Sequence, residues 1–198
     1  MKVTLTCNNA WGAGGQGNFL DRASKGLSAI ADLTVFCAGS EQPEMKFPVT
    51  SVGYSPWRKP FVSTPILRRR SDWLTLLCDL YFDKQVSKQL KTETCDLIVG
   101  VAGQSHLSFK TAKAQGAKIW LYCLNAYLPF MQEQMKQEEK ALRDRAVSSM
   151  NPRMIKRFRK ECEQADFILL NSEFAKGTFM QAGFPAEKMA ILTPVVNP

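Results

Sequence analysis

The chain has few of the residues that build metal centres or disulfide frameworks. It contains a single histidine, His106, and its six cysteines include no C-x-x-C pair. A structural zinc site needs about four Cys or His ligands at short spacings, so we expect no metal. Cysteines scattered through apolar segments are typical of buried free thiols in a reducing compartment.

Long hydrophobic runs are also missing from the sequence. A membrane-spanning helix needs roughly 18–20 consecutive apolar residues, and no segment approaches that length. The first residues, 1–6, have the pattern of a strand, and their apolar run is too short for a secretory signal peptide. We therefore expect a cytoplasmic protein.

The overall composition is that of a globular, basic domain. A chain of 198 residues with a 45% hydrophobic fraction can bury one sizeable core, and we treat 1–198 as a single domain. The net charge of +8 suits an anionic partner, such as a membrane surface, a phosphorylated ligand or nucleic acid. Because the sequence has no zinc-finger, RNP or helix-turn-helix pattern, nucleic acid is not the expected partner.

Strand-like and helix-like segments alternate along most of the chain. The predicted strands are 3–7, 33–37, 95–101, 118–123, 167–170 and 189–192. The predicted helices run from the first glycines to about 31, then over 105–115, 126–148, 152–165 and 172–183. The proline-rich segment 40–72 is expected to be a long loop with one short strand. This alternation predicts a Rossmann-like α/β/α fold, with a mostly parallel sheet between two layers of helices.

The C-terminal segment carries the most specific local signals. Ser172 is predicted to cap a helix, with Glu173 in the positive first turn. Gly183 is predicted to end that helix in the left-handed conformation, with a proline two residues later. Asn151 followed by Pro152 predicts a second helix start, since proline is favoured at the first helical position.

This segment resembles the junction between the two domains of GT-B glycosyltransferases of the family-4 type. The resemblance rests on Glu163-Gln-Ala-Asp166, Ser172, Gly183, Lys188 and Thr193-Pro-Val-Val-Asn197. It is strong over 155–197, moderate over the glycines of 12–17 and over 95–125, and poor over 40–90. It implies that the chain is one half of a GT-B fold. The implied reaction moves a sugar from a nucleotide-sugar donor to an acceptor hydroxyl, with retention and without a metal or another cofactor.

The resemblance also implies a missing second half. Residues 193–198 would begin the linker to a C-terminal domain that holds most of the donor contacts. We therefore expect the 198-residue chain alone to fold and to be catalytically inactive.

A glycine loop, Gly12-Ala-Gly14-Gly15-Gln16-Gly17, follows the first predicted strand and fits G-x-G-x-x-G. Glycines let the chain turn tightly, and the helix start offers free N–H groups to a phosphate. Three interpretations stay open: the loop of a glycosyltransferase acceptor domain, a dinucleotide site, or a plain βα turn. A dinucleotide site should have an acidic residue about 20 residues after the glycines, and Glu41 is the candidate. The segment 8–11, between the strand and the first glycine, makes the turn longer than in the dinucleotide pattern.

Polar residues follow two further predicted strands. Because ligands of open α/β sheets bind beyond the carboxyl ends of the strands, we predict that these residues lie near the acceptor or the phosphates, together with the glycine loop. The predicted set is Gly14, Gly15, Gln16, Gly17, Gln104, Ser105, His106, Asn125 and Tyr127. A lone histidine is also compatible with a structural role. Many family-4 enzymes have a histidine where this chain has Asn125 and Tyr127, so the catalytic residues stay unassigned.

Two basic clusters account for much of the net charge. Arg68, Arg69 and Arg70 stand close to a tryptophan in the sequence, and Arg153 and Arg157 are predicted on the polar face of the helix 152–165. Such clusters are either solvated faces or contacts with an anionic membrane surface that carries the acceptor.

Three functions therefore stay open. The first is the acceptor-binding half of a retaining glycosyltransferase, with a cell-envelope glycan or glycolipid as acceptor. The second is the NAD(P)-binding domain of an oxidoreductase, argued from the same glycines. The third is a non-catalytic domain that binds a membrane surface.

Overall fold

The computed structural model describes residues 1–39, 47–64, 71–142 and 150–192. Its strands form one seven-stranded sheet in the order β3-β2-β1-β4-β5-β6-β7, and every pairing is parallel. The strands are β1 (Lys2–Ala10), β2 (Asp32–Gly39), β3 (Val49–Ser51), β4 (Leu97–Val101), β5 (Lys118–Cys123), β6 (Phe167–Leu170) and β7 (Met189–Ile191). The predicted parallel sheet is confirmed.

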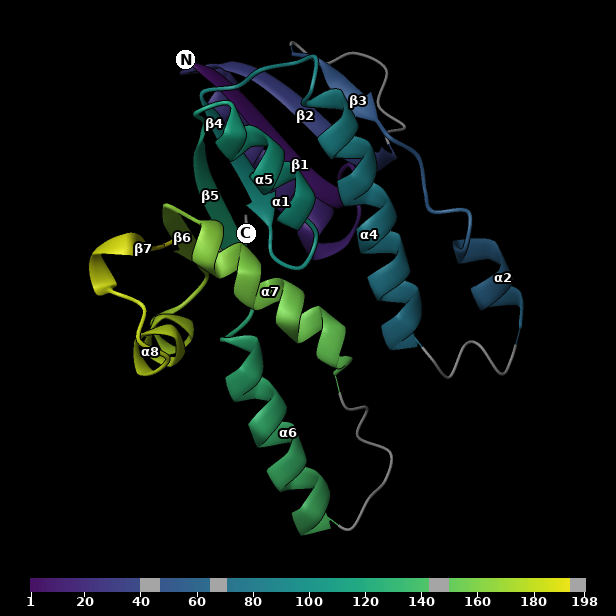
Figure 1. Ribbon diagram of the computed structural model, residues 1–198, viewed down its shortest axis with the longest axis vertical. Coiled ribbons are helices and arrows are strands. Elements are labelled where there is room, and N and C mark those ends of the chain that lie inside the picture. The colour runs from purple at the N-terminus through teal and green to yellow at the C-terminus, as the bar shows by residue number, and fades with distance from the viewer. Residues whose placement is uncertain (40–46, 65–70, 143–149, 193–198) are drawn as a thin grey trace, which may run out of the picture.

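Helices cover the sheet, as Figure 1 shows: α4, α5 and α7 lie on the near side and α1 lies behind. The helices are α1 (Gly14–Ser28), α2 (Arg58–Ser63), α4 (Ser71–Gln89), α5 (His106–Ala114), α6 (Leu128–Leu142), α7 (Pro152–Gln164) and α8 (Glu173–Gln181), with a 3-10 turn at Ala186–Lys188.

The two faces of the sheet bury two separate apolar cores, because successive strand residues point to opposite faces. Val35 packs into the core on the α1 side, and the next residue, Phe36, packs into the core under α4, α5 and α7. Val99 and Ile98 divide between the two cores in the same way. This division confirms the predicted three-layer α/β/α arrangement.

The predicted caps and several predicted boundaries agree with the structure. Asn151 accepts a hydrogen bond from the Arg153 amide, and Ser172 accepts one from the Ala175 amide. Gly183 has a φ of 89°, the left-handed conformation expected at a helix end. The strands predicted over 118–123 and 167–170 have the bounds of β5 and β6.

Two helices were not predicted. The segment 40–72 contains α2 and the start of α4 besides the short strand β3. No element was predicted for 73–94, most of which is α4. The first strand is also longer than predicted, because β1 continues to Ala10.

No helix among the described residues is both long enough and apolar enough to cross a membrane. The six cysteines are free thiols, and five of them are buried, as expected.

Candidate active site

The glycine loop lies at the carboxyl edge of the sheet, directly after β1. The chain leaves β1 at Ala10 and begins α1 at Gly14, so residues 11–13 alone separate strand from helix. Gly12 and Gly14 have φ values of 70° and 63°, which side-chain-bearing residues rarely adopt. Most of the segment 8–11, which was predicted to lengthen the turn, therefore belongs to β1, and the turn is shorter than predicted.

The start of α1 offers backbone donors to solvent. The first amides of an α-helix have no intrahelical partner, and Ala13 provides no side-chain cap for them. Gly14 and Gly15 are exposed, and an added Cβ on Gly15 would meet no atom within 4 Å. The helix dipole adds positive potential at this end, so the loop can bind an anionic oxygen.

Gly17, in contrast, is a packing residue. It is buried, and an added Cβ would lie 2.3 Å from the Ala10 carbonyl oxygen and 3.3 Å from Gly12 backbone atoms. Gly17 therefore allows α1 to begin directly against the end of β1. Gly17 was predicted to lie near the ligand, and in the structure it allows the close backbone approach of α1 to β1.

Three amides connect the glycine loop to the end of β4. The Asn8 backbone N–H donates to Gln104 Oε1 at 2.7 Å, and Gln104 Nε2 donates to Gln16 Oε1 at 3.0 Å. Gln104 is buried, and Gln16 is partly exposed beside the exposed glycines. The structure thus brings two predicted site residues, Gln16 and Gln104, into direct contact.

Behind these amides lies a buried charged cluster, formed by Asp79 and Asp83 of α4 and by Arg157 and Glu161 of α7. Arg157 contacts Asp83 through Nη2 and Glu161 through Nε. Asp83 accepts hydrogen bonds from the amides of residues 107 and 108 at 2.7 and 2.8 Å, and Glu161 accepts from the amides of residues 103 and 105. The cluster therefore holds the β4–α5 loop and the start of α5 in place.

Two carboxyls of this cluster have strongly perturbed pKa values. Desolvation raises the pKa of Asp79 from 3.8 to about 7, although the hydrogen bond from Asn8 Nδ2 at 2.8 Å and the Arg157 charge oppose the shift. Desolvation also raises the pKa of Glu161 from 4.5 to about 7, against the opposing effects of Arg157 and two backbone amides. Perturbed carboxyls beside a site are typical of functional regions, and structural ion pairs produce them as well.

Ser105 and His106 have structural partners. The Ser105 side chain is fully buried, and its hydroxyl donates to the Val101 carbonyl at 3.0 Å. His106 Nδ1 lies 3.1 Å from Gln164 Oε1, at the end of α7. Among the described residues, neither side chain has a hydrogen bond to Gln16, and a position near the acceptor or the phosphates stays a prediction for both.

Asn125 and Tyr127 follow β5 but differ in their surroundings. Asn125 is exposed, as a ligand contact would require. The Tyr127 ring packs against three phenylalanine rings, with centroid distances of 5.6 Å to Phe158, 5.2 Å to Phe179 and 5.7 Å to Phe184. Tyr127 therefore belongs mainly to the aromatic packing between α7 and α8.

The predicted basic surface is wrong at one position. Arg157 is only 6% exposed and forms an ion pair with buried carboxylates, so it cannot contact a membrane surface. Its helix turns this charge inward because the carboxyls of α4 lie opposite. Arg153 stacks over the Trp73 ring, 5.2 Å from its centroid. Arg68, Arg69 and Arg70 lie outside the described residues.

Four polar residues of this region were not predicted from the sequence: Asn8, Asp79, Asp83 and Glu161. One signal was present: two aspartates stand four residues apart inside the apolar segment 74–86, and an arginine and a glutamate stand four residues apart in 157–161. Charged pairs at that spacing share a helix face, and two such faces can pair when they are buried together.

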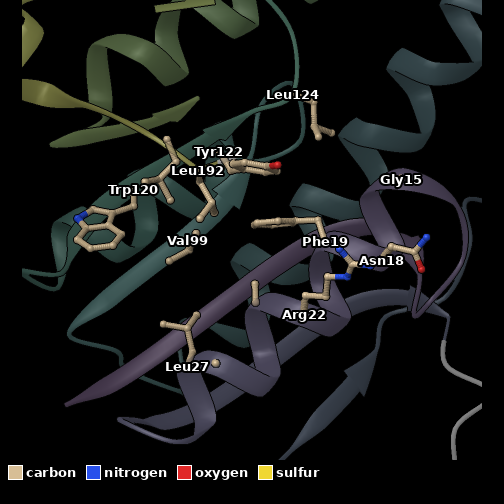
Figure 2. A pocket seen from close by; sticks show the side chains of 13 residues that line it. Gly15, Asn18, Phe19, Arg22, Leu27, Val99, Trp120, Tyr122, Leu124 and Leu192 are labelled. Atoms are coloured by element: carbon tan, nitrogen blue, oxygen red, sulfur yellow. The ribbon is translucent and has the colours of Figure 1, made fainter. Parts of the chain in front are cut away.

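A large apolar pocket lies on the α1 side of the sheet, between α1 and strands β4, β5 and β6. Its volume is about 770 Å³. Figure 2 shows Gly15 and Asn18 at its glycine-loop end, and Phe19 stacked on Tyr122 with ring centroids 3.7 Å apart. The lining residues are Gly15, Asn18, Phe19, Arg22, Ala23, Gly26, Leu27, Val99, Trp120, Tyr122, Leu124, Leu169 and Leu192. The exposed face of Gly15 therefore opens onto this pocket.

A metal centre has no support in the described part of the chain, where no three His, Cys, Asp or Glu side chains are placed to hold an ion.

Comparisons with known proteins show the fold of the chain. No protein-family model matches the chain, and no curated protein is similar to it in sequence. Among solved structures, WaaG, a glycosyltransferase involved in lipopolysaccharide biosynthesis, matches 99% of the chain with a TM-score of 0.60 and 14% identity. The lipopolysaccharide outer core galactosyltransferase WaaB matches 99% with a TM-score of 0.55 and 15% identity.

A nucleotide-sugar epimerase has the same fold. UDP-N-acetylglucosamine 2-epimerase from Rickettsia bellii matches 96% of the chain with a TM-score of 0.54 and 14% identity. The chain covers 46% of WaaG, 46% of WaaB and 44% of the epimerase, so it spans about half of their length. It therefore has the Rossmann-like fold of one half of a GT-B protein, as the sequence resemblance implied.

Proposed function

We propose that the chain is the acceptor-side half of a retaining glycosyltransferase, which moves a sugar from a nucleotide-sugar donor to an acceptor hydroxyl. The observation that carries this proposal is the glycine loop. Its residues Gly14 and Gly15 are exposed at a helix start, where N–H groups have no intrahelical partner, and they stand at the carboxyl edge of an all-parallel sheet, in a fold shared with two glycosyltransferases. The acceptor would be a glycan or glycolipid of the cell envelope.

The residues of this chain would bind and orient rather than form a covalent intermediate. The free amides at the start of α1 donate to a phosphate or sugar oxygen, and the positive end of the helix stabilises negative charge there. Most donor contacts would come from a second domain. We assign no metal, no cofactor and no catalytic side chain.

A second candidate function is isomerisation of the nucleotide sugar itself. The epimerase from Rickettsia bellii matches the chain about as well as WaaB does. The short turn between β1 and α1 is also compatible with a third candidate function, an NAD(P)-binding domain. The acid predicted for such a site, Glu41, lies outside the described residues.

Peripheral contact with an anionic membrane is part of the proposal. Trp57 and Tyr54 are exposed, and the Arg58 guanidinium lies 4.5 Å from the centroid of the Tyr54 ring. Aromatic rings beside arginines suit the membrane interface, and a lipid-linked acceptor would be found there. A non-catalytic domain that binds the membrane would use the same surface.

The products formed from a labelled nucleotide sugar test this proposal. The protein in its natural length is incubated with labelled UDP-sugars and a membrane extract, and the products are separated and identified. We expect labelled sugar on a glycan or glycolipid, with the anomeric configuration of the donor retained, and no product from the 198-residue chain alone.

The other outcomes separate the alternatives. An isomerised nucleotide sugar formed without any acceptor would support the epimerase function. Reduction of NAD(P) would support an oxidoreductase, and salt-sensitive vesicle binding with no turnover would support a binding domain. Each of these results would contradict sugar transfer by this protein.

A further inference from the structure

The orientation of a hydrogen-bond chain is fixed at the end of β1. The pairing of β1 with β4 ends at Thr6 and Gly100, so the Asn8 N–H lies just beyond that ladder. That N–H donates to Gln104 Oε1 at 2.7 Å. Because a backbone N–H can only donate, the carbonyl of the Gln104 amide faces Asn8 and its NH2 group faces the opposite way.

The same reasoning fixes the next amide. Gln104 Nε2 donates to Gln16 Oε1 at 3.0 Å, so the Gln16 carbonyl faces inward. The Cys7 thiol lies on that side as well, 3.8 Å from Oε1, and it too is a donor. Turning the Gln16 amide over would place two NH2 groups against each other and leave buried donors unpaired, which is costly.

Asn8, the first residue of this hydrogen-bond chain, is itself held by a buried carboxyl group. Its side-chain Nδ2 donates to Asp79 Oδ1 at 2.8 Å, across 71 residues of sequence. Asp79 and Gln104 are 7% and 6% exposed, so solvent has little access to rearrange these contacts. The orientation of the Gln16 amide is thus set by partners that are buried and by a backbone group that cannot reverse its role.

We propose that Gln16 is a specificity residue of the glycine-loop site, and that it offers the ligand N–H donors only. Its Nε2 has no partner among the described residues, and it stands beside the exposed amides of Gly14 and Gly15. All these groups are donors, so the site selects a ligand oxygen that accepts, such as a phosphate oxygen, and disfavours a ligand N–H or ammonium. This inference rests on the proposed function, because it takes the glycine loop as the ligand site.

The binding of inorganic pyrophosphate tests the donor role. The full chain is titrated with pyrophosphate, and the amide resonance of Gly15 and the side-chain NH2 resonances of Gln16 are followed by NMR. We expect both to shift on saturation. Gln16→Glu replaces the outward donors by a carboxylate, so we expect its affinity to fall at least about tenfold.

Two further variants sharpen the result. Gln104→Glu removes the donor that holds the Gln16 carbonyl, so the Gln16 amide is expected to turn over and the affinity to fall as in Gln16→Glu. Gln134→Glu, at an exposed position of α6, makes the same charge change and should stay within about twofold of the unmodified chain. Equal binding by Gln16→Glu and Gln134→Glu would overturn the inference.

The orientation itself is measurable without any ligand. Scalar coupling across hydrogen bonds should connect the Asn8 amide nitrogen with the Gln104 side-chain carbonyl carbon, and Gln104 Nε2 with the Gln16 side-chain carbonyl carbon. A coupling from Gln16 Nε2 to the Gln104 carbonyl would overturn the inference. Pyrophosphate that leaves Gly15 unshifted, with the expected couplings present, would instead contradict the phosphate site of the proposed function.

Discussion

Replacing Gly17 with alanine is expected to lower the free energy of unfolding by about 3 kcal/mol, at the upper end of the usual cost of overpacking. The added Cβ would lie 2.3 Å from the Ala10 carbonyl oxygen, and that neighbour is backbone, which cannot rotate away. The start of α1 must then move off the end of β1, so the exposed amides of the glycine loop are displaced too. Urea unfolding at neutral pH measures the loss.

Gly15→Ala is the matched control for this prediction. It lies two residues away in the same first turn, and its Cβ would meet nothing within 4 Å. Alanine restricts the unfolded chain and favours the helix, so this variant should be unchanged or more stable by up to about 1 kcal/mol. If both variants lose the same stability, the close packing of Gly17 against β1 is not what the glycine provides.

Replacing Arg157 with methionine is expected to cost about 3–5 kcal/mol at pH 8, the usual penalty for removing one member of a buried ion pair. Methionine keeps much of the aliphatic volume, but it leaves Asp83 and Glu161 buried without their guanidinium partner. These carboxylates hold the amides of the β4–α5 loop, so the loop should loosen as well. Chemical unfolding at several pH values measures the effect.

The pH dependence of the Arg157→Met variant has a definite sign. Burial already raises the pKa of Glu161 to about 7 in the unmodified chain, and Arg157 opposes that rise, so the variant's pKa is higher still. A folded-state pKa above the unfolded value gives stability that is present at low pH and is lost as the pH rises through the folded pKa. The deficit of the variant should therefore be smaller at pH 5 than at pH 8.

Arg153→Met is the control for Arg157→Met. Arg153 lies one turn earlier on α7 and stacks on Trp73 near the surface. We expect it to cost less than about 1 kcal/mol, with little dependence on pH. A loss as large as that of Arg157→Met would mean that the whole face of α7, rather than the buried ion pair, carries the effect.

The elements that the sequence predicted well are those whose local and tertiary preferences agree. The strands β5 and β6 are continuous apolar runs with turn residues at both ends. Asn151 and Ser172 cap helices by accepting hydrogen bonds from amides two and three residues further along the chain. Because these partners are close in sequence, the local residue pattern was enough to predict both caps.

The features that the sequence did not predict depend on contacts between distant segments. On the buried face of α4, Asp79 and Asp83 lie among apolar residues, whereas Leu80 is 39% exposed. The buried Asp83 pairs with Arg157 of α7, which is 74 residues away in the sequence, and it accepts hydrogen bonds from the amides of residues 107 and 108. The role of Gln104 likewise depends on Asn8 and Gln16, which the fold brings together from another strand and helix.

Sugar transfer by the Gly15→Trp variant, in the protein of natural length, tests most directly that the glycine loop is the functional site. A Cβ at this position would meet no atom within 4 Å and Gly15 lines the pocket, so we expect the tryptophan to project into the pocket and the fold to persist. Gly177→Trp is the control, because Gly177 is also an open helical glycine and lies on α8, outside the pocket lining. We predict a loss of transfer of at least about a hundredfold for Gly15→Trp, as expected when a reactant is displaced, and nearly unchanged transfer for Gly177→Trp. Equal transfer by the two variants, with both folded, would contradict the assignment of the glycine loop as the functional site.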